Sequence, residues 1–147
     1  MKKISLLIGL LSISIFSNPK DQPNFVIIYV DDMGYADIGE FQDEKISTPN
    51  LDLMASNGQT WTNFYASSSV CTPSRAGLLT GILPVRNGLY GDQIAVFFPG
   101  SKTGIPKNQL TLAEVFQTNG YSTGIFGKWH LGDAKEFLPT RHGFDEY

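Results

Sequence analysis

The sequence predicts an α/β fold, with a parallel or mixed β-sheet sandwiched by helices. Residues 25–30 form a continuously apolar, β-branched and aromatic run, which is typical of a strand buried on both faces of a parallel sheet. Strand-like and helix-like segments then alternate along the chain. The 147 residues are 41% hydrophobic, which is enough for one domain with a core, and we expect that domain to occupy residues 25–147.

The first residues have the layout of a secretory signal peptide. Lys2 and Lys3 precede an uncharged, mostly apolar run at residues 4–16. The run is shorter than the roughly 20 apolar residues of a membrane span and contains three serines, so we expect cleavage near residue 17 and no stable membrane anchor. Residues 18–24 form a polar lead-in. The mature chain is therefore expected to be exported to the periplasm or the extracellular space.

The first predicted helix begins at Thr48, which can act as N-cap because Pro49 suits the first helical position, and it ends at Gly58. Residues 61–66 resemble a second strand. Residues 74–80 are a short helical segment. The following residues 84–107 are rich in Gly and Pro, and we interpret them as an active-site loop.

A capping box at Thr111-Leu112-Ala113-Glu114 predicts the start of the next helix, with Leu110 and Val115 placed as a hydrophobic staple. Asn119-Gly120 ends this helix. Residues 121–126 then resemble a strand that leads directly into Lys128-Trp129-His130. We expect Trp129 to pack in the core.

Two polar clusters follow predicted strands, at the sheet edge where open α/β folds bind ligands. Asp31 and Asp32 come after residues 25–30, and Lys128 and His130 come after residues 121–126. Adjacent carboxylates repel each other unless a cation lies between them, so a hard divalent metal explains the first pair. A solvated turn is the alternative for Asp31 and Asp32, and a surface charge or a structural histidine is the alternative for the second pair.

The single cysteine, Cys71, cannot form an internal disulfide, and a small buried thiol is the plain interpretation of it. Its neighbours favour another role. Pro73 can start a helix and Arg75 lies one turn into it, so Cys71 is expected at a helix amino terminus, which attracts anions. Arg75 can add charge-assisted hydrogen bonds to an oxyanion or to a modified residue 71.

Three motifs resemble those of the sulfatase family, and they follow one another along the chain in the family's order. Cys71-Thr72-Pro73-Ser74-Arg75-Ala76-Gly77-Leu78-Leu79-Thr80-Gly81 is similar to the signature in which Cys-x-Pro-x-Arg directs oxidation of the cysteine to Cα-formylglycine. Gly127-Lys128-Trp129-His130-Leu131-Gly132 resembles the second signature, and Asp31-Asp32-Met33-Gly34 resembles the first metal-binding segment. The resemblance covers residues 24–147 and is closest to arylsulfatases. It implies the amino-terminal portion of an alkaline-phosphatase-like sulfatase domain.

The resemblance also implies a sulfuric ester hydrolase with one Ca²⁺ ion. Its metal ligands would be Asp31, Asp32 and Cys71, and its catalytic residues would be Cys71, Arg75, Lys128 and His130. In the implied mechanism, formylglycine at position 71 hydrates to a geminal diol, one hydroxyl attacks sulfur and the second expels sulfate. Arg75 stabilises the nucleophile, Lys128 binds the sulfate, and His130 holds the hydrated aldehyde and assists proton transfer.

The implied partners are a sulfate ester, aryl or carbohydrate, and a formylglycine-generating maturase. A net charge of -3 without a basic patch argues against nucleic acid. Two alternatives remain open. One is a phosphate or phosphonate ester hydrolase of the same superfamily, and the other is an inactive truncated fragment, because family members are longer and carry further ligands in their later half. Asp37, Asp133, Arg141 and His142 are interpreted as structural or surface residues.

Overall fold

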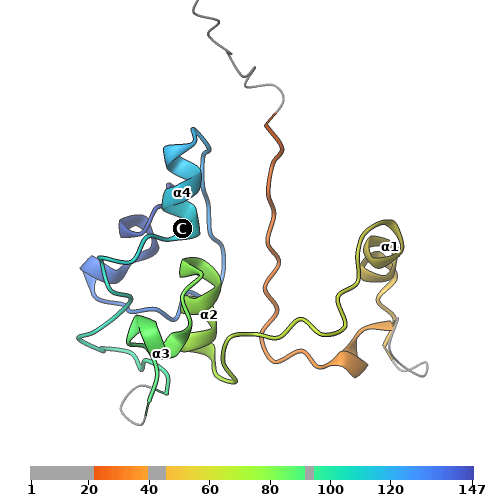
Figure 1. Cartoon of the computed structure of the whole chain (residues 1–147), viewed down its shortest axis with the longest axis horizontal. Helices are drawn as coiled ribbons and strands as arrows, with labels where there is room; N and C mark the ends of the chain where they lie inside the picture. The colour runs from red at the N-terminus through yellow and green to blue at the C-terminus, as the bar shows by residue number, and fades with distance from the viewer. Residues whose placement is uncertain (1–21, 40–45, 92–94) are drawn as a thin grey trace, which may run out of the picture. The chain divides into compact units, whose positions relative to one another are not determined.

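The computed structural model describes residues 22–39, 46–91 and 95–147 (Figure 1). The chain divides into two units, Met1–Asp32 and Met33–Tyr147. The predicted signal peptide lies outside the described residues. The helices are α1 (Pro49–Asn57), α2 (Cys71–Thr80), α3 (Pro84–Asn87) and α4 (Leu112–Thr118), and single 3-10 turns are η2 (Tyr35–Asp37), η4 (Lys135–Phe137) and η5 (Pro139–Arg141). No helix of the described segments is long and apolar enough to cross a membrane.

Residues 25–30 of the first unit are predicted to be a buried strand. In the structure they are extended but form no β-strand (Figure 1). Their side chains are exposed, and Val26 is 83% exposed. The prediction of a buried strand is therefore wrong for this structure. The physical reason is that β-branched and aromatic composition only indicates side chains that fit a pleated, half-buried surface, whereas a strand also needs a ladder to a neighbouring segment.

The other two predicted strands are also largely missing within the described residues. Residues 61–66 form a turn and irregular backbone, in which the Trp61 and Phe64 rings meet edge to face. At residues 121–126, pairing is limited to one parallel bridge between Gly124 and Glu146. The Ile125 amide donates to the Glu146 carbonyl oxygen over 3.0 Å. The expected sheet sandwiched by helices is thus not formed by the described residues.

Helix α1 has the predicted start and end, with Thr48 as N-cap and Gly58 as C-cap. The Thr48 hydroxyl does not cap a backbone amide of the helix. It donates instead to the Asp52 carboxylate over 2.9 Å and accepts from the Gly39 amide over 2.7 Å. Gly39, which lies shortly after η2, is therefore tied to the first turn of α1.

Helix α2 begins at Cys71, which confirms the expected position of this residue at a helix amino terminus, although the predicted segment 74–80 was three residues too short; its C-cap, Gly81, has the left-handed conformation. The early start is possible because Pro73 lies in the first turn, where a backbone N–H has no partner within the helix. The Ser74 amide makes the first helical hydrogen bond, to the Val70 carbonyl oxygen over 3.2 Å. The predicted loop at residues 84–107 contains the short α3, whose amides at Arg86 and Asn87 both donate to the Leu83 carbonyl.

The capping box of α4 is confirmed. Thr111 is the N-cap, its hydroxyl accepts from the Glu114 amide, and the Glu114 carboxylate accepts from the Thr111 amide over 2.7 Å. The same Thr111 hydroxyl donates to the His142 carbonyl oxygen over 2.8 Å. This one side chain therefore joins the start of α4 to the turn after η5.

The hydrophobic core lies in the second unit and gathers side chains from α2 and from the segments on either side of α4. Trp129 is 5% exposed, as expected of a core residue, and its indole N–H donates to the Phe137 carbonyl oxygen over 2.8 Å. The core places the 127–131 segment against the first turns of α2. Its buried members are Ala76, Leu89, Phe97, Ile105, Trp129 and Leu131.

Candidate active site

Cys71 and Lys128 come together although 57 residues separate them in the sequence. Cys71 is the first residue of α2 and is half-buried. The Lys128 ammonium donates to the Cys71 sulfur over 3.3 Å. The free amide N–H groups at the start of a helix also carry positive partial charge. The thiol therefore lies in an electropositive corner, which is formed by Lys128 and the amino terminus of α2. Such a corner favours the binding of an anion beside residue 71.

Arg75 lies one turn further along α2 and reaches the same segment as Cys71. Its guanidinium Nη1 donates to the Lys128 carbonyl oxygen over 2.6 Å. A charge-assisted bond of this length fixes the backbone of Lys128 relative to α2. Arg75 therefore holds in place the residue that contacts Cys71, in addition to bringing a positive charge.

The His130 ring is oriented by the backbone of Phe97, whose carbonyl oxygen lies 2.7 Å from Nε2. Since a carbonyl oxygen only accepts hydrogen bonds, Nε2 carries the proton, and in the neutral ring Nδ1 is the basic nitrogen. Nδ1 is buried and has no hydrogen-bond partner among the described residues. His130 also adopts the left-handed conformation, with φ of 59°. The hydrogen bond at Nε2 and the backbone conformation therefore fix the orientation of the His130 ring.

Thr72 is a residue of this corner that the sequence reasoning did not single out. It is fully buried, its hydroxyl donates to the His130 carbonyl oxygen, and it accepts from the Phe97 amide. Its position directly after Cys71 was the only signal in the sequence. Nothing in the local pattern indicates that its partners lie in segments far along the chain.

Asp31 and Asp32 end the described part of the first unit and are exposed, and Asp32 has φ of 55°. Their carboxylates are the hard oxygen donors that Ca²⁺ prefers, so the pair fits a calcium site chemically. Ca²⁺ takes about six to eight oxygen ligands, and this pair is a partial set. A thiol is a poor ligand for Ca²⁺, so residue 71 fits only after oxidation to an oxygen-bearing group. The described residues include no group of three or more His, Cys, Asp or Glu side chains positioned for a metal.

The carboxylates that we interpreted as structural are engaged in local backbone contacts. Asp37 accepts from the Gly34 amide over 2.7 Å, and Asp133 accepts from the Gly100 amide over 2.6 Å. His142 is 1% exposed and its ring packs 6.1 Å from that of Trp129. Loss of hydration on burial lowers the pKa of His142 below its ordinary 6.5, although the charge of Glu114 opposes this.

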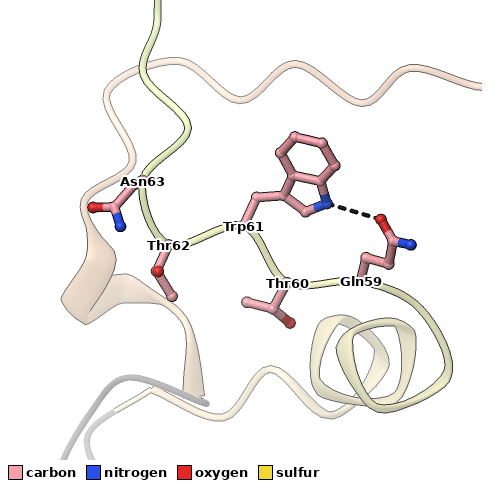
Figure 2. A pocket seen from close by; sticks show the side chains of 5 residues that line it. All are labelled: Gln59, Thr60, Trp61, Thr62 and Asn63. Atoms are coloured by element: carbon pink, nitrogen blue, oxygen red, sulfur yellow. Dashed lines mark hydrogen bonds between the residues drawn. The ribbon is translucent and has the colours of Figure 1, made fainter.

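Two open cavities are lined by none of the catalytic or metal-binding residues expected from the sequence. The larger, about 540 Å³, is lined by residues 59–63, where the Trp61 indole donates to the Gln59 side-chain oxygen over 3.1 Å (Figure 2). It contains none of the site residues expected from the sequence. The smaller, about 310 Å³, is lined by residues 96–101 and 103. The second cavity adjoins the site through Phe97, whose backbone contacts His130.

Comparison with known proteins identifies the family. The family model named Sulfatase matches residues 23–147. The chain belongs to the sulfatase family. Bovine arylsulfatase A is 51% identical to this sulfatase over 127 residues, which are 85% of the chain and 24% of the bovine protein. Human N-acetylgalactosamine-6-sulfatase is 42% identical over 135 residues, which are 89% of the chain and 26% of that protein.

A solved structure supports the fold of this sulfatase. The crystal structure of Ps i-CgsB is 38% identical with a TM-score of 0.71, covering 78% of this chain and 25% of that one. That protein has also been solved in complex with k-i-k-neocarrahexaose. The family and this neighbour imply an alkaline-phosphatase-like α/β fold, and the family implies Ca²⁺ and formylglycine. The sulfatase chain spans about a quarter of the length of these relatives.

Proposed function

We propose that this chain carries the nucleophile part of the active site of a sulfuric ester hydrolase. The enzyme hydrolyses sulfate monoesters with a formylglycine made from Cys71 and with one Ca²⁺ ion. The observation that carries the proposal is the contact between the Lys128 ammonium and the Cys71 sulfur, 3.3 Å apart at the start of α2. Membership of the sulfatase family and the arylsulfatase relatives support the reaction class.

The charges of this corner suit a sulfate monoester. The anionic oxygens of the ester repel a nucleophile until positive charge neutralises them. Lys128 and the amino terminus of α2 provide positive charge beside residue 71. Arg75 holds Lys128 through the backbone bond of 2.6 Å, so the ammonium needs little rearrangement when the ester binds. Lys128 is thus proposed to bind sulfate, and Arg75 to stabilise residue 71 and its surroundings.

His130 is proposed to move the proton at residue 71. In the neutral ring Nε2 donates to the Phe97 carbonyl, so Nδ1 is the atom that can take up a proton. The bond at Nε2 persists when Nδ1 becomes protonated, because both nitrogens donate in the charged ring. The ring therefore keeps its orientation in both protonation states.

Asp31 and Asp32 are proposed to hold the Ca²⁺ ion, together with the oxidised residue 71. When bound, the ion neutralises ester oxygens as a Lewis acid, and formylglycine supplies the nucleophilic oxygen. The proposed substrates are aryl or carbohydrate sulfates, in line with the arylsulfatase and N-acetylgalactosamine-6-sulfatase relatives. The proposal further includes export of the chain and a maturase partner that oxidises Cys71.

The proposal is tested by coexpressing the chain with a formylglycine-generating enzyme and assaying a chromogenic aryl sulfate with Ca²⁺. A matched assay uses Cys71→Ala, and mass spectrometry of the residue 71 peptide reports its oxidation. We expect turnover in the oxidised wild type and none in the variant. Equal turnover by both proteins contradicts the proposal, and faster turnover of an aryl phosphate than of the aryl sulfate favours a phosphate ester hydrolase.

A further inference from the structure

The hydroxyl group of Thr72 joins three segments of the second unit. Thr72 belongs to α2 and is 0% exposed. Its Oγ1 donates to the His130 carbonyl oxygen over 2.9 Å, 58 residues away, and accepts from the Phe97 amide over 3.1 Å, 25 residues away. One buried hydroxyl thus serves as donor to one segment and as acceptor from another.

A third hydrogen bond closes the arrangement, because the His130 ring donates from Nε2 to the Phe97 carbonyl oxygen over 2.7 Å. We call Thr72, Phe97 and His130 the threonine clamp. The clamp holds His130 at two points, its carbonyl and its ring. His130 has φ of 59°, a conformation that a non-glycine residue keeps only when its surroundings fix it. The clamp provides such surroundings.

We infer that Thr72 is a positioning residue, whose hydroxyl fixes the imidazole of His130 and the backbone of Phe97 relative to residue 71. Thr72 follows Cys71 directly in the first turn of α2. The two groups that its hydroxyl binds, the His130 carbonyl and the Phe97 amide, are therefore held in a fixed position relative to the start of that helix. The catalytic part of this inference rests on the proposed function. The structural part, which is that Thr72 fixes the positions of Phe97 and His130, does not rest on the proposed function.

The hydroxyl carries this role, and the methyl group does not. Replacement by valine keeps the shape of the side chain but leaves the Phe97 amide and the His130 carbonyl without their buried partner, which is costly. Replacement by serine keeps both hydrogen bonds and removes only a methyl group. The pair Thr72→Val and Thr72→Ser therefore separates hydrogen bonding from packing.

Amide hydrogen exchange in the ¹⁵N-labelled chain tests the structural part. We expect the Phe97 amide to exchange roughly tenfold faster in Thr72→Val, the factor that one ordinary hydrogen bond gives, and within about twofold of wild type in Thr72→Ser. The Val115 amide, which bonds to the Thr111 carbonyl within α4, serves as the reference. Thr80→Val is the matched control, because the Thr80 hydroxyl donates to the Ala76 carbonyl within α2.

Three results overturn the inference. Unchanged exchange at Phe97 in Thr72→Val shows that the hydroxyl holds nothing. Equal acceleration at Phe97 and at Val115 shows that it supports the fold as a whole. Failure of Thr72→Ser to restore protection shows that the methyl group is what matters.

Kinetics of the oxidised chain test the catalytic part. We expect Thr72→Val to lower kcat for an aryl sulfate at least tenfold with KM changed less than about threefold, because the ester contacts other groups. Thr72→Ser should recover kcat to within about threefold, and Thr80→Val should match wild type. An inactive wild type refutes the proposed function and leaves the exchange result to decide on the clamp. A Thr72→Val protein with wild-type kcat overturns the positioning role.

Discussion

Adding a single carbon at Gly143, as in Gly143→Ala, should lower the free energy of unfolding markedly. Gly143 follows His142 in the turn after η5 and has φ of 87°. A Cβ built there would lie 2.7 Å from the Ala113 carbonyl carbon and 2.7 Å from Glu114 Cγ, and it would also contact the Glu114 amide nitrogen. Two of these atoms are backbone of α4, so the clash is not relieved by turning a side chain.

The expected cost of Gly143→Ala has two parts. A left-handed conformation costs a residue with a Cβ roughly 1 to 2 kcal/mol relative to glycine. Overpacking against a fixed neighbour typically adds about 1 to 3 kcal/mol. The sum is about 2 to 5 kcal/mol, a large share of the roughly 5 to 15 kcal/mol that stabilises an ordinary domain. A fall in Tm on the order of 10 °C follows.

Thermal and urea unfolding of the variant measure this cost, and Gly120→Ala is its matched control. Gly120 has φ of 82°, and a Cβ there would meet nothing within 4 Å. The control should therefore lose only the conformational part, about 1 to 2 kcal/mol. If Gly143→Ala loses no more than Gly120→Ala, then the close approach between this turn and α4 does not contribute, and the reasoning is refuted.

Three further substitutions test the site and the core. Lys128→Met should lower kcat/KM for an aryl sulfate about 10²- to 10³-fold, because the ammonium beside Cys71 is lost. The Tm should shift little, because Lys128 is exposed. A loss of activity that is accompanied by unfolding contradicts this prediction. Trp129→Phe should cost about 1 to 3 kcal/mol in urea unfolding, because the bond to the Phe137 carbonyl and core volume are lost, and an unchanged midpoint argues against that core. The pKa of His142 is lowered below 6.5 by burial, so its contribution to stability is present above pH 6.5 and is lost as pH falls through the folded-state pKa. Urea unfolding at pH 7.5 and 5.5 should show this loss in wild type and a smaller one in His142→Gln; equal losses contradict it.

The features that could be predicted from sequence are those that neighbouring residues decide. Thr111 and Glu114 are three positions apart, and the capping box that they form needs nothing else. Pro49 likewise suits the first position of α1, so the start of this helix was predicted although the Thr48 hydroxyl caps none of its amides. The start of α2 was predicted near Cys71 because Pro73 tolerates only the first turn of a helix, and the exact first residue depended on the Val70 carbonyl.

Features that depend on distant partners could not be predicted in this way. Residues 25–30 have strand composition, but strand formation is decided by a neighbouring segment that local composition does not specify. The Thr72 hydroxyl was missed for the same reason, because its partners lie 25 and 58 residues away. Lys128 and Cys71 were associated through their motifs, whereas their 3.3 Å contact depends on the packing of the 127–131 segment against α2.

The burial of the cysteine motif sets an order of events. Once α2 has packed against the rest of the second unit, Thr72 and Pro73 are completely covered and Ser74 is nearly so. A maturase of the proposed kind that contacts residues 72–74 would therefore reach them only in a chain where α2 is not yet packed. If Cys71 is oxidised as proposed, folding and oxidation compete for the same molecules, and a variant that folds faster should carry more unmodified thiol.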